Sequence, residues 1–315
     1  MFRYGGSSDA IDALTDDEVY TLIRNRSDDT AIRAPDELNG AFADTVWRIS
    51  QDAVVKVTHS PTEAFMMSYV SSHTSIPIPK VRRILPAQAS DPDSSAKWIV
   101  MDNISGKTLE TEWPRMSTWR RLCALWSIRQ YIGELRRVPV PNRDVPGPFD
   151  VSGESYVCRG YYFTEDGSGP FHSYLDMAAW FDRRRFDVMA AIHSATGVIP
   201  RCPKFDCSHP LVLCHMDLHM RNFLVDARGK LWLIDWANAG AFPPWLEYAH
   251  MAIWADAARE EARPPKLWTF FLSFMVGNYR RYKTGYLDKL RWAWDRPSDD
   301  FFPIDYFSNL GLTLD

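Results

Sequence analysis

The chain has 315 residues, and its 36 Lys and Arg against 40 Asp and Glu give a formal net charge of -4 at pH 7. It contains no basic stripe long enough to follow a phosphate backbone, and no run close to the roughly 18 consecutive apolar residues of a membrane-spanning helix. We therefore expect neither a nucleic-acid partner nor a membrane span. Because one domain typically has roughly 100 to 200 residues, the length predicts two lobes.

The cysteines point to a reducing compartment. They number five, which is odd, and they form no CxxC pair, which argues against both a disulfide framework and a zinc site. The first residues lack the apolar segment of a secretory signal. We expect a cytoplasmic chain with reduced, mostly buried thiols.

The N-terminal part of the chain alternates between helical and β-rich patterns. Residues 16–26 carry apolar side chains at helical spacing, which predicts a helix with a packing role. The β-rich runs 44–50 and 52–58 follow closely on each other, as in a hairpin. The next helix is predicted to begin at Ser60, because Ser60 is a good N-cap and Glu63 stands three residues later, as in a capping box.

The composition changes beyond that helix. The prolines of residues 76–85 require an extended segment, and residues 97–104 are predicted to form a strand. From about residue 107 onward, helical periodicity with many aromatic side chains dominates, in residues 117–138, 174–194 and most of 246–282. The sequence therefore predicts a small β-rich lobe followed by a large helical one, which is an α+β fold.

The segment HMDLHMRNFLVDARGKLWLIDW, residues 215–236, combines polar residues with apolar runs. Two of these runs flank the loop DARGK, which predicts a hairpin. If Val225 pairs with Leu231, Asn222 and Asp235 meet at one end of that hairpin. An amide oxygen and a carboxylate at one place suit a hard cation such as Mg²⁺.

The same segment carries a family resemblance. HMDLHMRN and LIDW resemble the HxDLHxxN and IDW motifs of the aminoglycoside phosphotransferase family, the small-molecule branch of the protein-kinase-like fold. AVVKV resembles the strand that carries the family's lysine, and IVMDNISGKTL resembles the hinge between its lobes. The resemblance covers roughly residues 40–255, and GELRRVPVP and GPFHSYLDMAAW resemble segments of fungal members.

This resemblance implies a bilobal protein-kinase-like fold. Residues 1–102 would form an N-lobe with an N-terminal helical extension, and residues 103–315 a helical C-lobe with the catalytic loop and the acceptor pocket. The implied activity is transfer of the γ-phosphoryl group of ATP to a hydroxyl of a small metabolite, with Mg²⁺ as the metal ion. The expected partner is therefore a small hydroxylated acceptor.

The resemblance also implies roles at the nucleotide site. Lys56 would contact the α and β phosphates of ATP, and Glu63 would hold Lys56 in place. The backbone between Met101 and Asn103 would bind adenine. The loop over the phosphates should lie near residues 39–46, although the kinase pattern GxGxxG is absent there.

Further roles follow for the segment at 215–236. Asn222 and Asp235 would bind Mg²⁺, and Asp217 would orient the acceptor hydroxyl and accept its proton. His215 and His219 are assigned to support of the loop, because no HExxH or similar spacing makes them zinc ligands.

Each of these residues has a simpler alternative. Lys56 alternates with apolar neighbours, so it could be a strand lysine that faces solvent. Glu63 could serve only the capping box, and Asp217 could be an ordinary turn aspartate. Three correctly spaced partners favour the catalytic interpretation of Asp217.

Acidic and aromatic residues of the helical lobe are the candidates for the acceptor pocket. They would suit a cationic or aromatic acceptor such as an amino alcohol or an aminosugar. Their alternative is solvated helix faces and core aromatics. The candidates are Trp254, Asp256, Glu260, Glu261, Trp268 and Tyr279.

Two rival functions remain open at this point. A pseudokinase-like binding module would keep the fold and the nucleotide site without transferring phosphate. An ATP-dependent enzyme could instead activate a carboxylate for amide formation. The joint presence of Lys56, Asp217, Asn222 and Asp235 argues against the first rival, because a scaffold does not need all four.

Overall fold

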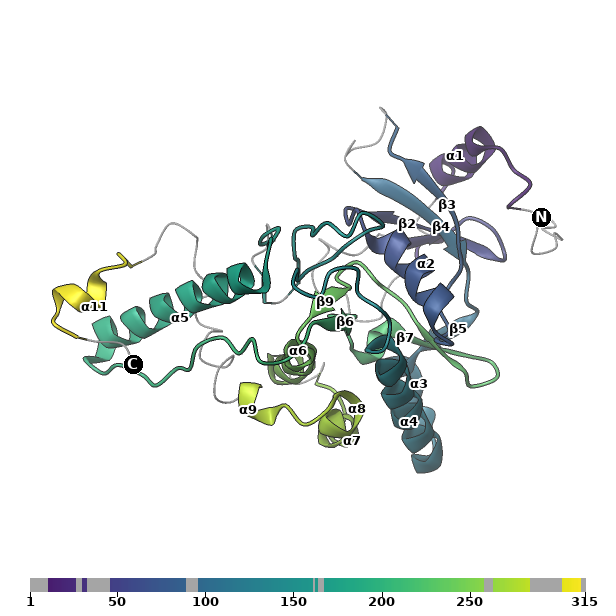
Figure 1. Cartoon of the computed structure of the whole chain (residues 1–315). Coiled ribbons are helices and arrows are strands. Elements are labelled where there is room, and N and C mark those ends of the chain that lie inside the picture. Colours follow the sequence, from purple (N-terminus) through teal and green to yellow (C-terminus); the bar gives the residue numbers. More distant parts are fainter. Residues whose placement is uncertain are drawn as a thin grey trace. The chain divides into compact units, whose positions relative to one another are not determined.

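The computed structural model describes residues 11–26, 30–32, 46–88, 96–160, 162–163, 167–257, 263–283 and 302–312, without the side chains of 253–257. Two compact units divide the chain: Met1–Val138 with His219–Ala239, and Pro139–Leu218 with Gly240–Asp315. Helices and strands occur together, so the expected α+β class is confirmed (Figure 1). The lobe boundary expected after residue 102 stays a prediction.

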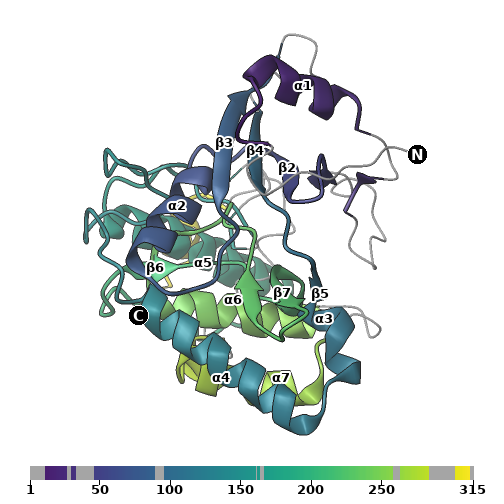
Figure 2. The same cartoon turned by 90° about the vertical axis from the view of Figure 1, so that its right-hand side faces the viewer.

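A four-stranded antiparallel sheet forms part of the first unit, in the order β1-β2-β4-β3 (Figure 2). A short turn joins β1 to β2, so the hairpin expected there is confirmed in its described residues. The strand expected at 97–104 is confirmed as well, and the proline-rich segment before it continues into a strand. The strands are β1 (Val46–Arg48), β2 (Ala53–Thr58), β3 (Val81–Pro86) and β4 (Lys97–Asp102).

The two faces of this sheet have different partners. Side chains alternate along β2, so neighbours point to opposite faces. Val55 belongs to a buried cluster with Val19 and Ile23 of helix α1 (Asp16–Arg24), which confirms the packing role expected for that helix. Lys56 points to the other face, where Glu63 of helix α2 (Glu63–His73) contacts it.

The start of α2 differs from the prediction. The helix begins at Glu63 after Thr62, whose side chain makes no cap hydrogen bond, so the N-cap role of Ser60 and its capping box were wrong. The Ser60 hydroxyl donates instead to the carbonyl oxygen of Ala237 at 3.1 Å. The Glu63 carboxylate is engaged by Lys56 and Thr58, so a bond back to the N-cap does not form.

A second sheet of the first unit carries the expected hairpin. Val225 pairs with Leu231, and the Ile234 N–H donates to the carbonyl oxygen of Asn222 at 3.0 Å, so the predicted register is confirmed. The strand order is β5-β7-β8. The elements of this region are β5 (Gly106–Thr108), α3 (Leu109–Glu112), η2 (Trp113–Arg115), α4 (Thr118–Leu135), η3 (Met220–Asn222), β7 (Phe223–Asp226) and β8 (Leu231–Leu233).

The described residues of the second unit include several helices and a two-stranded sheet. The helices expected at 174–194 and 246–282 are confirmed in the described residues, the latter as several shorter helices. Strand β6 (Val212–Cys214) pairs with β9 (Gly240–Phe242). The helices are α5 (Tyr174–Thr196), α6 (Pro244–Ala257), α7 (Lys266–Phe270), α8 (Leu272–Val276), α9 (Arg280–Tyr282) and α11 (Tyr306–Asn309).

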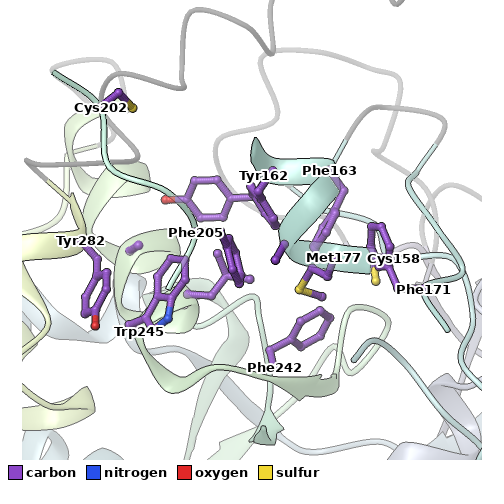
Figure 3. Packing of buried hydrophobic residues seen from close by; sticks show 14 of the residues in the cluster. Cys158, Tyr162, Phe163, Phe171, Met177, Cys202, Phe205, Phe242, Trp245 and Tyr282 are labelled. Carbon is purple, nitrogen blue, oxygen red and sulfur yellow. The ribbon is translucent and has the colours of Figure 1, made fainter. Parts of the chain in front are cut away.

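Aromatic side chains form the core of the second unit (Figure 3). The Trp245 ring stacks on Tyr282, with centroids 4.7 Å apart and an interplanar angle of 14°. Phe205 lies between Trp245, at 5.0 Å, and Phe181 of α5, at 4.8 Å. Large aromatic rings bury much apolar area, so this cluster holds α5, α6 and the connecting segments together.

The cysteines agree with the expectation of unpaired, mostly buried thiols. All five cysteines are free, and Cys158, Cys202 and Cys214 are buried. Burial raises the pKa of the Cys158 thiol far above its usual range. In the part of the chain that the structure describes, no helix is long and apolar enough to cross a membrane.

We predict that Phe181→Ala lowers the free energy of unfolding by about 3 to 5 kcal/mol, because it removes a fully buried ring and leaves a cavity. Urea unfolding of the purified chain measures this loss. Leu175→Ala, on the same helix but 72% exposed, is the control and should change the free energy by less than about 0.5 kcal/mol. Equal midpoints for the two variants would contradict the assignment of the core.

Candidate functional site

Three charged side chains of the first unit meet on the α2 face of the four-stranded sheet. The Lys56 Nζ lies 2.6 Å from Glu63 Oε1 and 2.7 Å from Asp235 Oδ1. The side chains of Lys56 and Glu63 are only 12% and 1% exposed, whereas that of Asp235 is 39% exposed. The reading of Lys56 as a solvent-facing strand lysine is therefore wrong, and its ion pair with Glu63 is present.

The electrostatics of this cluster keep Lys56 charged. Burial by itself would lower the pKa of Lys56, but the nearby carboxylates of Glu63 and Asp235 outweigh burial and raise that pKa above its ordinary value of 10.5. A raised pKa makes the stabilisation fully present below about pH 10 and lost only in more alkaline solution. The Lys56 side chain is thus a cation at neutral pH.

A buried hydroxyl completes the surroundings of Glu63. Thr58, at the end of β2, donates its hydroxyl hydrogen to Glu63 Oε2 at 2.6 Å. Both carboxylate oxygens therefore have donors, as a buried carboxylate requires. Sequence reasoning missed Thr58, although its position two residues after Lys56 on the same strand face was a usable signal.

The backbone around Asp235 is strained. Asp235 has φ of 64°, in the left-handed region that non-glycine residues rarely adopt. On one side the Ile234 N–H bonds to Asn222, and on the other the buried Trp236 indole N–H donates to the carbonyl oxygen of Leu233 at 3.2 Å. Such conformations persist only where the surroundings hold them, and they cluster at functional sites.

Asn222 and Asp235 offer a donor set that fits Mg²⁺. Asn222 is buried at the end of η3, directly before β7, and its Nδ2 lies 3.4 Å from the His219 Nε2. Among the residues that the structure describes, no group of three or more His, Cys, Asp and Glu side chains could hold a metal. A carboxylate and an amide oxygen still suit Mg²⁺, because this ion usually keeps waters and takes further oxygens from substrate phosphates.

Asp217 lies in the second unit, on the loop after β6. Its backbone N–H donates to the His215 Nδ1 at 3.2 Å, and Met216 between them has φ of 63°. The backbone N–H of His215 donates to Oε1 of Glu247 on α6 at 2.8 Å. These bonds agree with the support role expected for His215.

Sequence reasoning missed Glu247. It is 0% exposed, and a fully buried carboxylate needs hydrogen-bond donors to offset its desolvation. Its usable signal was an acidic residue inside the apolar segment AFPPWLEYAHM, which begins six residues after Asp235.

The segment expected to bind adenine is partly engaged within the chain. The Asn103 N–H donates to the carbonyl oxygen of Asp52 at 2.8 Å, and its side-chain amide donates to Gln51 at 2.9 Å. Met101 is paired with both neighbouring strands. Because the Asn103 N–H is already bonded, the Asn103 carbonyl oxygen is the backbone group of this residue that we consider for adenine.

The remaining expected residues lie in the second unit or outside the described residues. Trp268 is a buried core residue, and Tyr279 packs against Tyr282 and His209. Both side chains therefore agree with the alternative interpretation, core aromatics, and not with an acceptor pocket. The side chains of Trp254 and Asp256 are outside the description. So are Glu260, Glu261 and residues 39–45 of the expected phosphate-covering loop.

Comparison with known families agrees with the motif. Residues 36–283 match the family described as "Phosphotransferase enzyme family". The chain belongs to this family. The resemblance to aminoglycoside phosphotransferases is thereby confirmed, since the match covers most of the chain.

Individual relatives are distant. The clavilactone A biosynthesis cluster protein Y of Ampulloclitocybe clavipes is 22% identical over an alignment of 245 residues; the coverage is 64% of this chain and 58% of that protein. The alignment thus spans less than two thirds of that relative.

Solved structures of aminoglycoside phosphotransferases are also similar to the chain. A thermostable mutant of APH(4)-Ia in its apo form is 18% identical, with 89% of this chain and 96% of that chain covered and a TM-score of 0.47. The GDP and kanamycin complex of APH(2")-IIia is 14% identical, with 88% and 86% covered and a TM-score of 0.48. At these values nothing about substrate is carried over.

We predict that Lys56→Met lowers the free energy of unfolding by about 3 kcal/mol at neutral pH, because it leaves the Glu63 carboxylate buried without its cation. Urea unfolding at neutral pH measures the loss. Lys97→Met, at an exposed position of β4, is the control; an equal loss in both variants would contradict the buried pair.

Proposed function

We propose that the chain is a phosphotransferase that moves the γ-phosphoryl group of ATP to a hydroxyl of a small metabolite, with Mg²⁺ as the metal ion. The observation that carries the proposal is the cluster of Lys56, Glu63 and Asp235. A buried lysine kept charged by two carboxylates is suited to binding phosphate oxygens. Membership in a phosphotransferase family supports the same reaction.

The residues divide the work as follows. Lys56 binds phosphate oxygens of ATP, Glu63 orients Lys56, and Asp235 with Asn222 would hold Mg²⁺, which neutralises phosphate charge when bound. Asp217 accepts the proton of the acceptor hydroxyl. The acceptor oxygen bonds to the γ phosphorus as the bond from that phosphorus to the bridging oxygen breaks, and ADP leaves with this electron pair.

Two observations support a small acceptor. Asp235 is followed by Trp and Ala instead of the Phe and Gly of protein kinases, and no Ala-Pro-Glu follows downstream. The fungal relative is named after a clavilactone A biosynthesis cluster, which agrees with a metabolite as the acceptor.

Nucleotide binding is the first test. We expect Mg²⁺ with ATP to raise the thermal midpoint more than either alone, because a ligand that binds only the folded state stabilises it by RT ln(1 + [L]/Kd). Mg²⁺ alone should have a small effect, since Lys56 already occupies one oxygen of Asp235. If neither ATP nor the mixture shifts the midpoint, the proposed nucleotide site is wrong.

Asp217→Ala tests the catalytic role. With an acceptor found by ADP release, we expect kcat to fall by roughly 10² to 10⁴, because the general base is lost, while ATP affinity changes little. Asp176→Ala, at an exposed position of α5, is the control and should keep kcat. An unchanged kcat in Asp217→Ala would remove Asp217 from the mechanism. An acyl phosphate and an amide-linked product would instead identify carboxylate activation.

A further inference from the structure

Ser60 links the segment between β2 and α2 to the loop that follows Asp235. Its hydroxyl lies 3.1 Å from the carbonyl oxygen of Ala237, two residues after Asp235. The Thr62 hydroxyl is farther from the Ser60 hydroxyl, at 3.4 Å. A distance of 3.1 Å is within the ordinary range for a hydroxyl donor, so the contact with Ala237 is a hydrogen bond.

The position of this bond matters because Asp235 is strained. A non-glycine residue with φ of 64° costs about 1 to 2 kcal/mol and needs contacts on both sides to hold it. Before Asp235, the hairpin bond from Ile234 to Asn222 fixes the backbone. After Asp235, Ser60 fixes the carbonyl of Ala237, and the Ala239 N–H donates to the carbonyl oxygen of Trp236 at 3.2 Å.

The same short segment also holds the partner of Lys56. Thr58 donates to Glu63 Oε2 at 2.6 Å, and its hydroxyl oxygen accepts the Ser60 N–H at 3.1 Å. Thr58, Ser60 and Glu63 therefore form one connected hydrogen-bonded set. One end of this set orients Glu63, and the other end holds the Asp235 loop.

We propose that Ser60 is a positioning residue for Asp235: its bond to Ala237 keeps the Asp235 carboxylate in the orientation that binds the metal-nucleotide complex. The proposal rests on the proposed function, since it assigns Ser60 to the same site. Ser60 touches no reacting atom and acts through the backbone of the loop. Ser60 lies outside the motif segment at residues 215–236.

The test compares Ser60→Ala with Ser68→Ala. Ser68 lies on α2 and also donates its hydroxyl to a backbone carbonyl, that of Ala64 at 3.0 Å, but has no contact with the Asp235 loop. We expect Ser60→Ala to weaken ATP binding in the presence of Mg²⁺ by about two- to tenfold, the effect of one neutral hydrogen bond, and to leave binding without Mg²⁺ unchanged. Ser60→Thr keeps a hydroxyl and should restore the affinity.

Hydrogen exchange gives a readout that does not depend on nucleotide. Loss of the Ser60 bond should speed amide exchange in residues 236–239 and leave exchange in β7 unchanged, because opening is then local. In an Asp235→Ala background, Ser60→Ala should have no further effect on ATP binding, since both act through one carboxylate.

The outcomes separate the two proposals. A wild-type chain that does not bind ATP with Mg²⁺ contradicts the proposed function. A wild type that binds, while Ser60→Ala matches Ser68→Ala in affinity and in exchange, contradicts only the positioning role. Faster exchange together with weaker Mg²⁺-dependent binding supports it.

Discussion

A lysine can be buried in a sheet only if carboxylates replace the hydration that it loses, and this constraint organises the first unit. Lys56 sits in the middle of β2, and Glu63 is the first residue of α2. Their ion pair therefore ties the start of the helix to the centre of the sheet. Because an unpaired buried charge would be costly, alternative placements of α2 on the sheet are disfavoured.

Asp235 extends this constraint to a distant part of the chain. It follows β8, yet its carboxylate shares Lys56 with Glu63. Its strained backbone is held by bonds from two directions, the hairpin on one side and Ser60 on the other. The Asp235 carboxylate and the Lys56 ammonium group are therefore oriented before any ligand arrives, as the proposed function requires.

The second unit orients Asp217, the proposed general base, by a different means. Its aromatic core anchors β6 and α6, and the loop that carries Asp217 begins directly after β6. The buried Glu247 carboxylate accepts a hydrogen bond from the backbone N–H of His215. The His215 ring Nδ1 in turn accepts one from the backbone N–H of Asp217. Apolar packing thus sets the strand and the helix, and two hydrogen bonds set the loop between them.

The sequence by itself determined the features that depend on neighbouring residues. The β-rich pattern predicted the strand that carries Lys56, although its alternation also allowed a solvent-facing lysine. The DARGK loop predicted the hairpin register, and the motif spacing selected Asp217, Asn222 and Asp235 as candidates. Only the tertiary structure decided that Glu63 pairs with Lys56 and does not form a capping box. Likewise, only the structure revealed the hydrogen bond from the Ser60 hydroxyl to the Ala237 carbonyl oxygen. The same holds for the bond from the Asn103 N–H to the Asp52 carbonyl oxygen. Local patterns cannot predict these contacts, because each polar group could also form a hydrogen bond with a neighbour in sequence. Folding decides which distant partner competes with that neighbour.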